Sequence, residues 1–221
     1  EEKQLNLAFY PKGLLPFHKY KEHVSTAFEE HLFEGALYAS SNNLAKIHFT
    51  ISEKHKHHFD EEFKFIEEDV EKRTNTKFNI SFSYQKESTD TIAVNHENDL
   101  YRDENNQLVF RPSGHGALIR NLNELDADII FIKNIDNVVV KKYKNEVADY
   151  KMMLAGVLLE TQEQAFYCLK QLDNNSSSEA ELLEIIEFLS NKLNISVGNE
   201  FEKYSVKHQI KYLNLQLYMC I

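Results

Sequence analysis

The chain has 221 residues, of which 42% are hydrophobic and 27% are charged, and its formal net charge is −10. This composition predicts a soluble protein with one large α/β domain, or with one domain and a helical appendage. The negative charge argues against nucleic acid or anionic membranes as partners, and no apolar run approaches the roughly 20 residues of a membrane helix. The two cysteines, Cys168 and Cys220, lack zinc or disulfide spacing, and the polar N-terminus is unlike a signal peptide, so the sequence favours the cytoplasm.

The first motif in chain order is Tyr10-Pro11-Lys12-Gly13-Leu14-Leu15-Pro16-Phe17. Its two prolines and its glycine exclude a regular helix and predict a loop that holds Lys12 in place. Beyond this loop, apolar side chains recur three and four residues apart over residues 21–39, which predicts an amphipathic helix. Asn42 and Asn43 then mark the end of the helix.

Two strand patterns and a second helix follow. Residues 45–51 alternate between apolar and polar side chains, and residues 77–84 do the same, as strands do. Between them, Ser52 stands at a favourable N-cap position for a helix that Asn75 ends. Strands that alternate with helices of this length are typical of βαβ units, so we expect an α/β fold with a mostly parallel or mixed twisted sheet flanked by helices.

The middle of the chain combines a long polar loop with an apolar segment. Residues 85–112 are polar and irregular, and loops of this length in compact domains are more often functional than not. Residues 114–125 predict a glycine turn that leads into a helix. The continuous apolar run at residues 128–132 is typical of a parallel strand buried on both faces.

The C-terminal part is helical in pattern. The spacing of apolar residues predicts one helix over residues 143–172 and another over residues 179–193, joined by a polar linker at residues 174–178. Cys168 lies on the apolar face of the first of these helices, so we expect it in the core. The residues after 193 are too weakly patterned to assign.

The clearest candidate for a ligand site is the turn Arg111-Pro112-Ser113-Gly114-His115-Gly116. Gly114 and Gly116 flank His115, which lets the backbone approach a flat ligand or a phosphate, and the helix that follows offers free N–H groups. Asp136 follows the predicted strand at 128–132 directly. A carboxylate at the carboxyl end of a strand is well placed to hold Mg²⁺ against substrate phosphates. A plain glycine turn and an ordinary Asx turn are the alternatives.

Two further residues fit such a site. Lys12 can offset phosphate charge that develops in phosphoryl or nucleotidyl transfer, and Gln85 carries an amide donor and acceptor that can read a base edge. For each, the alternative is a solvated surface side chain. His55, His57 and His58 lie among lysines and acids, which favours a solvated helix face over a metal site. The GxGxxG, Walker and GxSxG patterns are absent from the sequence, which argues against Rossmann oxidoreductases, P-loop proteins and α/β-hydrolases.

The chain resembles two groups of proteins in the order of its motifs. These motifs are Lys12-Gly13-Leu14-Leu15-Pro16, Gln85, Gly114-His115-Gly116-Ala117-Leu118-Ile119 and Ile135-Asp136-Asn137. The closer resemblance is to the bacterial domain of unknown function 4301 family, to which Ser88-Thr89-Asp90-Thr91 and the run from Asp128 are specific. That resemblance covers residues 9–160 well and the rest loosely. More distantly, the chain is similar to the UDP-sugar pyrophosphorylases and the wider sugar-nucleotidyltransferase fold.

The distant resemblance implies a nucleotide-diphospho-sugar transferase-like fold and a role for each motif. Lys12 would contact phosphate and act in catalysis, and Asp136 would bind Mg²⁺. Gln85 and the Gly114–Gly116 turn, including His115, would hold the nucleobase. The implied ligands are a nucleotide or nucleotide-sugar and a sugar phosphate.

One departure from that pattern concerns the N-terminus. The superfamily's first strand and its Gly-rich, Arg-containing phosphate loop normally precede the lysine loop, whereas eleven residues precede Lys12 here and residues 1–10 contain no glycine. We therefore expect residues 1–160 to form a nucleotidyltransferase-like domain that lacks this strand and loop, and residues 161–221 to form a truncated helical segment. The leading hypothesis is Mg²⁺-assisted attack of a sugar 1-phosphate on a nucleoside triphosphate. The alternatives are a catalytically inactive nucleotide- or sugar-phosphate-binding protein, or a fragment with no activity of its own.

Overall fold

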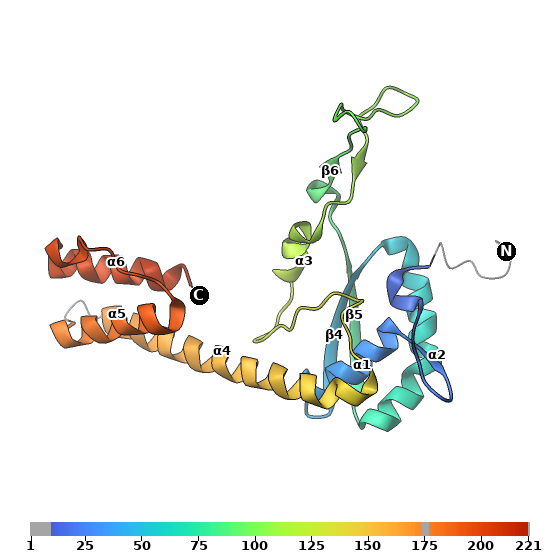
Figure 1. Cartoon of the computed structure of the whole chain (residues 1–221), viewed down its shortest axis with the longest axis horizontal. Coiled ribbons are helices and arrows are strands. Elements are labelled where there is room, and N and C mark those ends of the chain that lie inside the picture. The colour runs from blue at the N-terminus through green and yellow to red at the C-terminus, as the bar shows by residue number, and fades with distance from the viewer. Residues whose placement is uncertain (1–9, 174–176, 221) are drawn as a thin grey trace. The chain divides into compact units, whose positions relative to one another are not determined.

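The computed structural model describes residues 10–173 and 177–220. The chain divides into two compact units, an N-terminal unit of residues Glu1–Asp149 and a C-terminal unit of residues Tyr150–Ile221. Figure 1 shows the helices and strands of both units along the chain. Each unit has its own hydrophobic core.

The N-terminal unit mixes short strands with helices. Its strands are β1 (Pro16–Lys19), β2 (Val24–Thr26), β3 (Ser40–Ser41), β4 (Leu44–Ile51), β5 (Lys77–Tyr84), β6 (Thr91–Ile92) and β7 (Phe110–Arg111). Its helices are α1 (Ala27–Tyr38), α2 (Lys56–Thr74) and α3 (Ile119–Leu122), with 3-10 turns η2 (Lys12–Leu14), η3 (Glu53–His55), η4 (Glu87–Thr89), η5 (His115–Leu118) and η6 (Lys141–Tyr143). An α/β fold is therefore confirmed.

The centre of this unit is the parallel pair β4 and β5. The two strands pair without a bulge from Leu44 opposite Lys77 to Ile51 opposite Tyr84. Their alternation gives the sheet one apolar face, on which α1 and α2 pack, and one polar face. Figure 1 shows α1 and α2 beside the two strands. The core consists of Leu14, Phe28, Leu32, Ala45, Phe49, Phe59, Ile66, Val70 and Phe78.

Several elements expected from the sequence are present. The strands predicted at residues 45–51 and 77–84 are β4 and β5, and the helix expected between them is η3 with α2, which ends at Asn75 in a left-handed conformation. The helix predicted over residues 21–39 begins later, at Ala27, because residues 16–26 form the antiparallel hairpin β1–β2. The helix expected from Gly114 is short, because η5 and α3 end at Leu122.

The prediction of a buried parallel strand at residues 128–132 is wrong. These residues form no strand, and Ile132 is 68% exposed. The segment instead follows α1, where the Phe131 ring lies 4.8 Å from the Tyr38 ring and Lys133 pairs with Glu34. A continuous apolar run does not by itself distinguish a strand from another packed segment, because a strand also needs a neighbouring strand.

The long polar segment after β5 forms an arm built from two tight turns. In one turn the side-chain Oδ1 atom of Asn95 accepts from the Glu97 and Asp99 N–H groups. In the second turn the Oδ1 atom of Asp103 accepts from the Asn105 and Gln107 N–H groups. The arm begins at β6 and returns at β7, which pair antiparallel. The return of the chain at β7 brings Ser113 and the glycine turn back to the end of β5.

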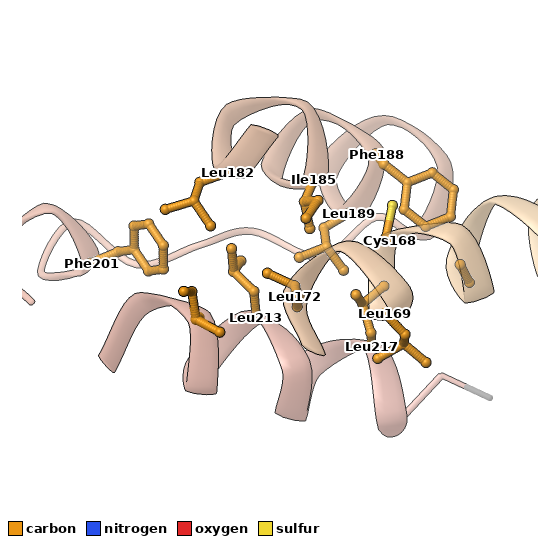
Figure 2. Close-up of a cluster of buried hydrophobic side chains, with 12 residues drawn as sticks. Cys168, Leu169, Leu172, Leu182, Ile185, Phe188, Leu189, Phe201, Leu213 and Leu217 are labelled. Carbon is orange, nitrogen blue, oxygen red and sulfur yellow. The ribbon is translucent and has the colours of Figure 1, made fainter. Parts of the chain in front are cut away.

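The C-terminal unit is helical. It contains most of α4 (Lys144–Asp173), then α5 (Glu179–Leu193), η7 (Phe201–Lys203) and α6 (Val206–Tyr218). The helices predicted over residues 143–172 and 179–193 are thus confirmed as α4 and α5; part of the predicted linker, residues 174–176, lies outside the described residues. The core joins the end of α4 to α5 and α6, and Figure 2 shows Cys168 beside Phe188 and Leu172 beside Leu189 and Leu213. The helices in the described ranges include none that is long and apolar enough to cross a membrane.

Candidate functional site

Lys12 owes its position to the glycine that follows it. Gly13 is buried in η2, and a Cβ atom placed there would lie 3.1 Å from Ile135 and 3.1 Å from Phe59. Only a residue without a side chain lets the loop lie this close to both residues without moving them. The loop is thereby held against the segment that carries Asp136.

Lys12 and Asp136 meet across 124 positions of the sequence. The Lys12 Nζ atom donates to the Asp136 Oδ2 atom at 3.2 Å, and the two side chains are 75% and 50% exposed. The hydrogen bond from Lys12 holds the pKa of Asp136 below its usual value, and the nearby His115 acts in the same direction. The carboxylate is therefore ionised at neutral pH and open to solvent.

Gln85 is joined to the residue before the glycine turn. In one orientation its amide donates to the Asp90 carboxylate across 3.4 Å and its polar atoms face like groups of the Ser113 backbone. In the other, the amide donates to the Ser113 carbonyl oxygen at 3.2 Å and accepts from the Ser113 N–H at 2.7 Å. The second orientation satisfies the Gln85 amide, because it forms two hydrogen bonds with the Ser113 backbone. The amide that was expected to face a base thus holds Ser113.

Further contacts fix the segment after the turn to the end of β5. The Asn121 amide donates to the Ser83 hydroxyl at 3.0 Å and to the Tyr84 carbonyl oxygen at 2.8 Å. Arg120 donates to the Ser88 hydroxyl at 2.9 Å. Asn121 is buried, and sequence reasoning missed it; the available signal was an amide close after a glycine turn.

Within the described residues, neither backbone conformation nor packing requires glycine at the two glycines of the turn. Both have ordinary backbone conformations, and a Cβ atom placed on Gly114 or Gly116 would meet nothing within 4 Å. The space beside them is therefore open. Such space is compatible with a ligand that approaches the backbone closely, and with a plain surface turn.

A buried network beneath the site fixes the segment that carries Asp136. The His31 Nε2 atom donates to the Ile135 carbonyl oxygen at 3.0 Å, and burial lowers the pKa of His31, which keeps its ring neutral. Lys133 pairs with Glu34, and Lys144 pairs with Glu30 and donates to its carbonyl oxygen at 2.7 Å. Sequence reasoning missed these residues, although consecutive glutamates on the apolar side of the predicted helix were a visible signal.

In the described residues Asp136 does not belong to a complete metal site. In residues 10–173 and 177–220, no group of three or more His, Cys, Asp or Glu side chains is placed to hold a metal ion. Asp136 alone offers one carboxylate. Mg²⁺ is commonly bound by one or two carboxylates together with water and substrate phosphates, so Asp136 fits a metal that arrives with a phosphate ligand and does not fit one bound by protein alone.

Two other sequence expectations concern residues away from this site. His57 is exposed, as expected for a solvated helix face, whereas His58 is half-buried; both lie within reach of the Glu61 carboxylate. Cys168 is buried in the C-terminal core, as predicted.

The described part of the chain is thus a mixed α/β protein with an exposed ion pair between Lys12 and Asp136. The chain belongs to the family described as Domain of unknown function (DUF4301), which matches residues 1–221. The resemblance to this family is thereby confirmed, and it extends over the whole chain. No curated protein and no solved structure matches the chain, so the comparisons lend no support to the more distant similarity to sugar nucleotidyltransferases.

Proposed function

We propose that the N-terminal unit binds a nucleotide or nucleotide-sugar as its Mg²⁺ complex, with the phosphates at Lys12 and Asp136. The observation that carries the proposal is the ion pair between these two side chains, which come from distant segments and remain open to solvent. An ammonium group is the partner of phosphate, and a carboxylate is the partner of Mg²⁺. A metal–phosphate complex supplies both.

The ion pair presents little obstacle to such a ligand. Both side chains are well exposed, and exposed ion pairs contribute little to stability because water and salt screen them. On binding, Lys12 would exchange Asp136 for a phosphate oxygen, and Asp136 would exchange Lys12 for the metal. The ionised state of Asp136 suits it for this exchange.

The glycine turn would receive the base or ribose of the same ligand. His115 lies close enough to Asp136 to lower its pKa, which joins the turn and the charged pair in one surface. The open space beside Gly114 and Gly116 allows a flat group to lie against the backbone. In this proposal Gln85 acts by holding Ser113, since its amide already pairs with that backbone.

A second candidate function is the transfer reaction itself. A sugar 1-phosphate oxygen would attack the α-phosphorus of a nucleoside triphosphate, and the bond to pyrophosphate would break. The contact between a lysine and a carboxylate favours it, since the lysine and a Mg²⁺ ion held by the carboxylate would both offset phosphate charge in such a reaction. Phosphoryl-transfer sites usually gather several cationic groups and metal ligands, however, so we place binding first.

Calorimetric titration with UTP, and separately with UDP-glucose, tests the proposal. With Mg²⁺ present, we expect both ligands to bind wild type, and Asp136→Asn and Lys12→Gln each to weaken binding at least about tenfold, or 1.4 kcal/mol. Asp126→Asn and Lys19→Gln, which change exposed residues of the same types, are the matched controls. Absence of binding to wild type, or equal loss in the controls, would contradict the proposal.

The same samples separate binding from transfer. UTP and glucose 1-phosphate are incubated with the protein and Mg²⁺, and pyrophosphate is measured. Binding without pyrophosphate release supports a binding protein and excludes transfer with this substrate pair. Pyrophosphate release that Asp136→Asn abolishes would make the second candidate the function.

A further inference from the structure

Strand β5 is an edge strand of the central sheet, and at its end the Asn121 amide already donates to the Tyr84 carbonyl oxygen. Among the described residues it pairs with β4 alone, whereas the other side of β4 is shared with β3 at Ala45 and Leu44. An unpaired edge presents a row of N–H and C=O groups to which another strand can bind. Proteins usually blunt such edges with proline, a bulge or several charges. β5 has no proline or bulge, and its one charge is Lys77 at its start.

A hollow lies against this edge strand. It has a volume of about 460 Å³ and is lined by Phe78, Ile80 and Phe82 of β5 and by Phe63 and Asp60 of α2. Asn79, from the opposite face of β5, also lines it. Because residues of both α2 and β5 line the hollow, it lies between this helix and the edge strand. Its apolar lining is continuous with the core of the N-terminal unit.

The sequence of β5 is complementary to itself in the antiparallel direction. If two copies pair about Ile80, Phe78 of one copy lies opposite the partner's Phe82, and Ile80 lies opposite the partner's Ile80. On the other face Asn79 lies opposite the partner's Ser81. Aromatic and β-branched pairs across strands are stabilising, and this register places no like charges opposite each other.

We propose that a second copy of this chain occupies the edge, so that the protein forms a twofold-symmetric dimer through β5. The contact uses the same surface on both copies, which is the usual form of a closed homodimer. It completes the backbone hydrogen bonds of β5 and joins the two hollows over the apolar side chains. This proposal does not depend on the nucleotide site.

Sedimentation velocity of the whole chain tests the proposal, at concentrations between about 1 and 100 μM, where weak dimers dissociate. We expect wild type to sediment as a dimer at the highest of these protein concentrations. Asn79→Lys with Ser81→Lys places lysines opposite lysines in the proposed register and should give a monomer. Asn79→Lys with Ser81→Glu places opposite charges there and should retain the dimer, and both double variants lose the same Ser81–His48 hydrogen bond.

Circular dichroism and thermal unfolding verify that the variants fold. If a double variant does not fold, the single variant Asn79→Lys, at an exposed position, replaces it in the test. This variant should raise the dimer dissociation constant at least about threefold. A wild-type monomer throughout the concentration range would overturn the proposal. So would equal dimer formation by the Lys–Lys and Lys–Glu variants, because the contact would then lie elsewhere.

Discussion

Glu30 and Lys144 form a buried ion pair in the N-terminal unit. They are 1% and 4% exposed. The cost of burying Glu30 is offset by Lys144, by the Tyr20 hydroxyl, which donates to it at 2.7 Å, and by His18, so that its pKa is lowered. Each charge needs its partner, because an isolated charge in the interior is far more costly than a paired one. The pair also fixes the start of α4 to α1, and with it the segment that carries Asp136.

Replacement of one member of this pair should destabilise the protein strongly. We expect Lys144→Met to lower the free energy of unfolding by about 3–5 kcal/mol, because it leaves the Glu30 carboxylate buried without its cation. Urea unfolding measures the change. Lys141→Met, at an exposed position three residues earlier, should change stability by less than about 0.5 kcal/mol. A similar small effect of both variants would show that Lys144 is not paired in solution.

Tyr20 should make stability depend on alkaline pH. Burial and the hydrogen bond to Glu30 raise the pKa of Tyr20 from its ordinary 10.0 to about 12. Since the folded pKa is the higher one, its contribution to stability is complete below pH 10.0 and is lost as the pH rises towards 12. Urea unfolding from pH 8 upwards should show this loss, and Tyr20→Phe should reduce it. An unchanged slope in Tyr20→Phe, or the same reduction in the exposed Tyr167→Phe, would contradict this assignment.

At the scale of elements, periodic segments were predictable and tertiary contacts were not. β4, β5, α2, α4 and α5 follow directly from alternating or helical spacing. The hairpin β1–β2 was missed because Val24 fits a helical stripe as well as a strand. The run at residues 128–132 was misassigned because its apolar side chains pack along α1, which no local pattern reveals. The contact between Lys12 and Asp136 likewise cannot be derived from spacing; the family resemblance gave each residue a ligand role but did not predict the contact.

The start of α5 offers a prediction at this scale. Ser178 and Glu181 form a capping box, in which each side chain binds the other's backbone N–H. Ser205, at the start of α6, has no such bond to the backbone. We therefore expect Ser178→Ala to cost about 1 kcal/mol and Ser205→Ala to cost clearly less, measured by thermal unfolding. Equal losses would show that the box does not persist in solution.

For the whole molecule, two separate cores imply two cooperative units. The N-terminal core is centred on Phe28 and the C-terminal core on Leu213, both fully buried. Multi-domain proteins commonly depart from a single unfolding transition. The sequence indicated an α/β part followed by a helical part. It left η7 and α6 unassigned because the pattern of apolar residues there is weak. Nevertheless, α6 contributes three buried side chains to the C-terminal core.

Calorimetry should resolve these units as two transitions. Phe28→Ala should lower the free energy of unfolding of the N-terminal unit by about 3–5 kcal/mol. Leu213→Ala should lower the free energy of unfolding of the C-terminal unit by about 2–5 kcal/mol. Each variant should leave the remaining transition close to its wild-type midpoint. A single transition that both variants shift equally would mean that the cores unfold as one.

The most direct test of the proposed site is paramagnetic. Mn²⁺ accepts the same carboxylate and phosphate ligands as Mg²⁺ and broadens the NMR signals of nearby protons. We expect Mn²⁺ with UTP to broaden the His115 imidazole signals in wild type, and Mn²⁺ alone to have little effect, because Asp136 is a single carboxylate. Asp136→Asn should remove the broadening. Unbroadened His115 signals in wild type with Mn²⁺ and UTP, or broadening that Asp136→Asn leaves intact, would contradict the account.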